Sequence, residues 1–236
     1  MIHHSRRTDI HEAIDTGISL LDNLSHHPTR ILEKAFKDTA LHRVLSPHHI
    51  GILAPSSSHG DLSIAIEGRG LEVLSVFPSA VVTAQLTQCF GKRVSVDIYL
   101  CRPMTDHVDD FTTGHDKVGA CPKMEIFRVV DGLTAEDIRA AMSDVLHVAY
   151  TPRQPTDTAT ISQKMLVEGF EYVGGGINSN EPMSEENAIT VLYFRKRQPI
   201  EGIPKIEFFL PGKHALPPVP GTADPSKRSF NDPTLW

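Results

Sequence analysis

The sequence predicts an α+β protein in which an antiparallel sheet is flanked by helices and preceded by two N-terminal helices. Apolar residues recur at helical spacing near the N-terminus, and several later segments alternate between apolar and polar residues, as strands do. No βαβαβ alternation, the pattern typical of a doubly wound parallel sheet, is present. The 236 residues are 40% hydrophobic, which suits one large domain with extensions.

The chain divides into three predicted segments. Residues 1–45 form a helical extension, with one helix from about residue 8 to 24, capped by Thr8 or Asp9, and a second from Pro28 to near Leu45. Residues 46–213 form the α+β domain. Residues 214–236 form a proline-rich tail that we expect to be extended along the surface or loose.

The first part of the domain shows strand patterns at residues 50–53, 62–66 and 94–100, and an apolar segment at 71–77. A helix follows residue 78, with Val82, Leu86 and Cys89 on one face. Residues 103–123 form a long polar loop. Its acidic residues and histidine favour a solvated loop over a metal site; they are Asp106, Asp109, Asp110, His115 and Asp116.

The second part begins with a strand at residues 124–130 that ends in an Asp-Gly turn. Thr134, followed by Asp137 three residues later, predicts a capped helix that continues through Leu146 and ends before Pro152. The triple glycine at 174–176 predicts a flexible turn, and strands follow at residues 189–194 and 202–211.

The last strand contains the most informative side chain, Glu207. Period-two alternation places Ile206, Phe208 and Leu210 on one face and Glu207 with Phe209 on the other. A carboxylate among apolar residues is costly to bury unless it is paired or protonated. Two interpretations remain open at this point: Glu207 faces water from a half-covered sheet, or it points into a ligand cavity.

Composition narrows the class of protein. The net charge of −6 argues against general nucleic-acid binding, and no apolar run reaches the roughly 20 residues of a membrane helix. The N-terminus does not resemble a secretion signal, and three cysteines without CxxC spacing fit reduced thiols in a cytoplasmic protein. We therefore expect a small-molecule substrate and no nucleic-acid or membrane partner, with the oligomeric state left open.

Thirteen histidines are present, and six of them form adjacent pairs at 3–4, 26–27 and 48–49. Neighbouring residues of a helix or strand point in different directions, so such pairs are poor chelators. HExxH and comparable metal motifs are absent from the sequence. The sequence therefore predicts neither a metal nor another cofactor.

Two stretches together resemble the chorismate pyruvate-lyase family. One is Val82-Thr83-Ala84-Gln85-Leu86, which continues into Gly91-Lys92-Arg93-Val94-Ser95-Val96; the other is Glu207-Phe208-Phe209-Leu210-Pro211. The resemblance covers about residues 71–211. It implies a six-stranded antiparallel sheet that encloses a dry ligand cavity, and a cofactor-free elimination of pyruvate from chorismate. The same fold serves as an effector-sensing domain in some bacterial transcription regulators.

The resemblance also implies a set of site residues. Glu207 takes the place of the family's acid, and Thr83 matches a threonine of its helix. The family's carboxylate-binding arginines fall near Met124 and Met142. Arg128 and Arg139 lie close in sequence but out of register, and Arg128 is the candidate carboxylate anchor. Methionines in place of arginines favour a more apolar ligand.

Three functions follow from this resemblance. The first is a lyase close to chorismate pyruvate-lyase. The second is a lyase, isomerase or cyclase of secondary-metabolite biosynthesis on the same scaffold. The third is a ligand-binding module without catalysis, which would normally accompany a DNA-binding domain.

Overall fold

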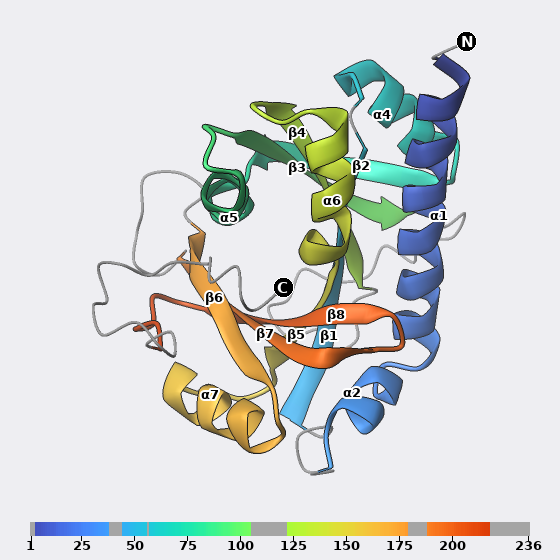
Figure 1. Cartoon of the computed structure of the whole chain (residues 1–236). Coiled ribbons are helices and arrows are strands. Elements are labelled where there is room, and N and C mark those ends of the chain that lie inside the picture. Colours follow the sequence, from blue (N-terminus) through green and yellow to red (C-terminus); the bar gives the residue numbers. More distant parts are fainter. Residues whose placement is uncertain (1–2, 38–43, 56, 105–121, 179–187, 218–236) are drawn as a thin grey trace.

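The computed structural model describes residues 3–37, 44–55, 57–104, 122–178 and 188–217 (Figure 1). In these residues one eight-stranded mixed sheet runs in the order β2-β3-β4-β1-β5-β8-β7-β6. The strands are β1 (Leu45–Leu53), β2 (Leu71–Pro78), β3 (Ser95–Pro103), β4 (Lys123–Asp131), β5 (His147–Pro152), β6 (Glu171–Asn178), β7 (Ile189–Ile200) and β8 (Ile203–Pro211).

The sheet consists of two halves with the same internal pairing. In the first half, β1 pairs in parallel with β4, β4 antiparallel with β3, and β3 antiparallel with β2. In the second half, β5 pairs in parallel with β8, β8 antiparallel with β7, and β7 antiparallel with β6. The antiparallel pair β1 and β5 joins the halves. The chain therefore contains a structural repeat that sequence analysis did not detect.

The predicted fold class is wrong. The sheet is mixed rather than antiparallel, because β1 and β5 each have a parallel neighbour, and it has eight strands rather than the six of a chorismate-lyase-like sheet. Parallel strands need a long crossover, and here β4 and β8 return to β1 and β5 only after two intervening strands. Local sequence patterns identify strands but not which distant strand becomes the neighbour.

Helices cover both faces of the sheet. They are α1 (His3–His26), α2 (Arg30–Ala35), α4 (His59–Glu67), α5 (Ala80–Phe90), α6 (Ala135–Val145) and α7 (Thr158–Val167). Apolar residues of α1, α2, α4 and α7 share one core with the face that carries Ile50, Val148 and Phe208. Residues of α5 and α6 pack on part of the opposite face, against Leu53 and Phe127. Among the described residues, no helix is both long and apolar enough to cross a membrane.

Several local predictions need correction. Residues 62–66 lie in helix α4 rather than in a strand, because Ser58 caps a helix whose buried residues are Leu62, Ala65 and Ile66. The triple glycine lies inside β6, where a side chain at Gly175 would meet the backbone of β7. Helix α2 is shorter than expected, and β5 and α7 were not predicted. The acidic loop from Asp106 to Asp116 and the tail beyond residue 217 lie outside the described residues.

The capping box at the start of α6 is confirmed. The Asp137 backbone N–H donates to Thr134 Oγ1 over 3.2 Å, and the Thr134 backbone N–H donates to Asp137 Oδ2 over 3.0 Å. These two bonds satisfy backbone donors that the first helical turn would otherwise leave unpaired.

We expect the Thr134→Ala substitution to lower the free energy of unfolding by about 1 kcal/mol, because it removes the side-chain acceptor of the cap. Urea denaturation measures the change. Thr134→Ser keeps the hydroxyl and serves as the control. Equal stabilities of the Ala and Ser variants would contradict a stabilising cap.

Candidate metal centre

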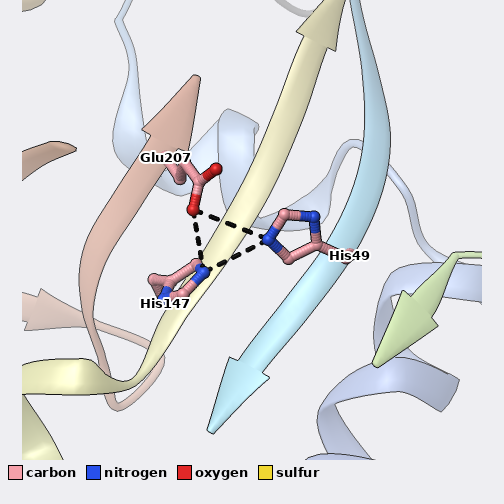
Figure 2. A group of neighbouring side chains, drawn as sticks. All are labelled: His49, His147 and Glu207. Carbon is pink, nitrogen blue, oxygen red and sulfur yellow. Dashed lines mark hydrogen bonds and ion pairs between the residues drawn. The ribbon is translucent and has the colours of Figure 1, made fainter. Parts of the chain in front are cut away.

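Three buried polar side chains meet at the centre of the sheet, where its two halves join. They are His49 of β1, His147 of β5 and Glu207 of β8 (Figure 2), and each is no more than 2% exposed. His147 Nε2 lies 2.9 Å from Glu207 Oε2 and 3.2 Å from His49 Nε2, and His49 Nε2 lies 3.5 Å from Glu207 Oε2. Three ligand-type atoms therefore form a nearly equilateral triangle.

The size of this triangle fits a shared metal ion. Nitrogen and oxygen ligands bind a transition-metal ion at about 2.1 Å, which places ligand atoms about 3.0 Å apart at right angles and about 3.4 Å apart at tetrahedral angles. The measured separations of 2.9, 3.2 and 3.5 Å span those values. An ion could therefore bind all three atoms with little movement of the side chains.

Each histidine has a second partner that leaves its Nε2 directed at the centre. His147 Nδ1–H donates to the backbone carbonyl of Val145 over 2.7 Å. His49 Nδ1 lies 2.8 Å from His48 Nδ1, and His48 stacks on Phe209 with ring centroids 4.0 Å apart. Burial, followed by the His49 charge, lowers the pKa of His48 to about 3, so His48 is a neutral acceptor for His49 Nδ1–H. Such partners orient metal-binding histidines.

A β-bulge explains how His48 and His49 both reach the site. The register between β1 and β5 shifts between Pro47 and His49, which interrupts the alternation of side chains along β1. The expectation that adjacent histidines point apart is therefore wrong at this pair. His49 faces the centre, and His48 supports it from the side.

Glu125 of β4 belongs to the same cluster. Its Oε2 lies 3.5 Å from His49 Nε2, and its side chain is 15% exposed, compared with 3% for Glu207. Glu125 pairs in register with Gly51, two residues after His49, and Glu207 pairs with Ala149, two residues after His147. Each half of the sheet thus supplies one histidine and one glutamate from equivalent positions.

The cluster shifts the pKa values of its members in ways that a cation would relieve. Burial raises the pKa of Glu125, and the nearby Glu207 charge raises it further despite the opposing histidines. Burial also acts to raise the pKa of Glu207, but His49 and His147 outweigh it and hold the pKa below its ordinary value. Burial lowers the pKa of His49, yet Glu125 and Glu207 together raise it overall. The site attracts positive charge.

Tyr193 of β7 completes the surroundings of Glu207. It lies directly across from Glu207 in the β7–β8 register, and its hydroxyl hydrogen-bonds to the Glu207 carboxylate. Burial and the charges of Glu207 and Glu125 raise the pKa of Tyr193 well above its ordinary value, so the hydroxyl keeps its proton. It therefore remains a donor that fixes one orientation of Glu207.

The structure brings only one of the residues proposed from the sequence into this centre, namely Glu207. Arg128 lies on the other face of the sheet, where its Nη2 is 3.4 Å from Asp97 Oδ2. Met124 is fully buried in the core shared by the sheet, α1 and α4, and Met142 of α6 is partly buried against the core that contains Leu86 of α5. Thr83 Oγ1 accepts a hydrogen bond from the Val96 backbone N–H. The assignment of these residues to substrate binding stays a prediction.

Sequence analysis missed His49, His147 and Glu125. The sequence did carry one indication of each: a histidine pair in an apolar strand, a histidine just after an amphipathic helix, and a glutamate within a predicted strand. These positions are 22 or more residues apart in sequence, so only the strand pairing brings them together.

Comparisons with known proteins do not assign the chain to a family. No family model matches the chain, and no curated protein matches it. Among solved structures, a glyoxalase family protein from Bacillus cereus aligns with a TM-score of 0.24 and 19% identity, over 70% of this chain and 93% of that chain. A TM-score this low does not establish a shared fold. None of these comparisons bears on chorismate pyruvate-lyase.

Gly51 is required by the position of His147. A Cβ at Gly51 would overlap the His147 imidazole, which lies across β1 at that point. We expect Gly51→Ala to displace His147 and to weaken divalent-metal binding by about tenfold or more, as losses of ligand orientation do.

Isothermal titration of the metal-free protein with Co²⁺ measures this effect. Gly60→Ala is the matched control, because a Cβ there meets nothing closer than Ser58 Oγ at 4.0 Å. Wild-type Co²⁺ affinity in a folded Gly51→Ala protein would contradict the assignment of His147 as a ligand.

Proposed function

We propose that this protein is a metal-dependent enzyme that acts on a small molecule as a lyase or isomerase. The observation that carries the proposal is the equivalent contribution of one histidine and one glutamate from each half of the sheet, with His49, His147 and Glu207 around one point and Glu125 beside His49. His49, His147 and Glu207 would hold a divalent transition-metal ion such as Zn²⁺, Co²⁺, Ni²⁺ or Mn²⁺, since mixed imidazole and carboxylate sets suit these ions.

The two glutamates have different surroundings and support different roles. Glu207 is buried, is hydrogen-bonded to His147 and Tyr193, and is ionised, which suits a permanent ligand. Glu125 is the more exposed carboxylate and has a raised pKa, which suits exchange of a proton with substrate. A bound metal ion would polarise a substrate oxygen and so acidify a neighbouring C–H bond. Glu125 would accept that proton and then donate it to another atom of the substrate or to the leaving group.

A second candidate function is that of an oxygenase, because His49, His147 and Glu207 alone form a set of two histidines and one carboxylate. That set is typical of non-haem Fe²⁺ oxygenases, which keep open positions for substrate and oxygen. The role of Glu125 separates the two functions. A lyase or isomerase needs Glu125 and no oxygen, whereas an oxygenase consumes oxygen with Fe²⁺ bound.

Metal titration tests the proposal directly. We expect the wild-type protein, after treatment with a chelator, to bind one Co²⁺ ion per chain, and we expect Glu207→Gln to weaken the affinity by about 100-fold, because it removes the ligand charge. Glu67→Gln, an exposed change at the end of α4, is the matched control. Failure of the wild-type protein to bind Co²⁺, Zn²⁺, Mn²⁺, Ni²⁺ or Fe²⁺ would refute the proposed function.

The metal affinity should depend on pH. His49 must be deprotonated to bind a metal, and Glu125 and Glu207 raise its pKa, so protons compete with the ion. As the pH falls through that raised pKa, we expect the apparent Co²⁺ affinity to decrease by up to about tenfold per pH unit for each proton displaced. Titrations between pH 8 and pH 5 measure the slope. An affinity that stays constant over this range would contradict histidine ligation.

A further inference from the structure

Lys123 lies beside the proposed metal centre on the face of the sheet that carries Glu125. It pairs in register with His49, and it precedes Glu125 by two residues, which places both side chains on the same face of β4. The intervening Met124 is buried on the opposite face. Lys123 therefore neighbours the proposed ligand His49 across the strands and the proposed base Glu125 along β4.

The charge of Lys123 reaches the centre, and no described residue forms an ion pair with it. Burial is the main influence on the pKa values of His48, His49 and Glu125, and the Lys123 charge lowers all three. Among the residues that the structure describes, the Lys123 ammonium makes no hydrogen bond or ion pair. Because no described residue pairs with this half-buried ammonium, it is positioned to bind a negative charge carried by a ligand.

The repeat within the sheet offers an internal comparison. Lys205 occupies the equivalent place in the second half, in register with His147 and two residues before Glu207. Lys205 is 6% exposed, lies over the Tyr193 ring and is influenced by the charge of Asp144 on α6. Protein groups thus surround Lys205, whereas Lys123 lies on the side where Glu125 keeps the site partly accessible.

The charges of the site favour an anion at this place. The carboxylates of Glu125 and Glu207 would balance a divalent ion, and His48 is neutral. Among the described residues, Lys123 therefore leaves the accessible side with one positive charge in excess. An anionic group bound through one oxygen to the metal ion would place a second oxygen toward the Lys123 ammonium. Opposite charges at such separations are worth a tenfold change in affinity or more in a partly buried site.

We propose that Lys123 binds the substrate's anionic group and that the substrate is a small carboxylate coordinated to the metal ion. This inference rests on the proposed function, because the carboxylate is bound jointly by the ion and by Lys123. It assigns the substrate class rather than the reaction.

Oxalate binding to the Co²⁺-loaded full-length protein tests the inference, with oxalate as a small carboxylate probe. We expect Lys123→Met to weaken oxalate binding by about tenfold or more, and we expect Lys123→Arg, which keeps the charge, to stay within about threefold of wild type. Lys164→Met, an exposed lysine of α7 on the opposite side of the sheet, is the matched control.

Co²⁺ affinity supplies a second readout of opposite sign. Removal of a positive charge beside the metal should leave Co²⁺ binding unchanged or make it tighter, whereas damage to the fold would weaken both metal and oxalate binding. Oxalate affinity within about twofold of wild type in Lys123→Met would overturn the inference while the metal site stands. A wild-type protein that binds no metal would overturn the proposed function, and this inference with it.

Discussion

The structure depends on a concentration of charge at its centre. Two carboxylates and two imidazoles cluster in the sheet: His49, His147 and Glu207 lie 2.9 to 3.5 Å from one another, and Glu125 lies 3.5 Å from His49. Three of the four side chains are almost wholly buried. Burial of ionised groups is expensive unless opposite charges or a metal ion compensate it. Both imidazoles use Nδ1 for partners outside the cluster, so each directs Nε2 inward. A cation among these atoms resolves the imbalance.

The repeated architecture explains why the cluster lies where it does. The first strand of each half meets its counterpart at the middle of the sheet, and the fourth strand of each half flanks the first. A histidine on the first strand and a glutamate on the fourth therefore converge with their equivalents from the other half. Gly51 and Ala149, the small residues opposite the two glutamates, leave room above the strands for the imidazoles and carboxylates.

Local patterns predicted most strands and the α6 cap, because alternation and capping depend on neighbours in sequence. They also singled out Glu207 as an acid that is costly to bury, but they left open whether it faces water or a cavity. They could not reveal His147, whose strand follows α6 so closely that the helical pattern was extended through Leu146. His49 was dismissed by a rule of alternation that the bulge after Pro47 breaks. The parallel pairings depend on contacts between segments far apart in the chain.

The two glutamates occupy equivalent positions in the two halves of the sheet, but their different surroundings shift their pKa values in opposite directions. Burial acts to raise the pKa of Glu207, but both histidines favour its ionised form and lower the pKa overall; Tyr193 donates a hydrogen bond to the same carboxylate. Glu125 occupies the equivalent register, but burial and the Glu207 charge raise its pKa, and it keeps some access to solvent. Pairs of acids whose pKa values are driven apart are typical of sites that divide acid–base roles. The same asymmetry holds for the lysines: Lys205 has Asp144 nearby, whereas no described residue forms an ion pair with Lys123. Within the described part of the chain, the accessible side of the centre therefore combines a proton acceptor with a cation that has no ion-pair partner, which is the combination that the proposed metal-bound carboxylate substrate would require.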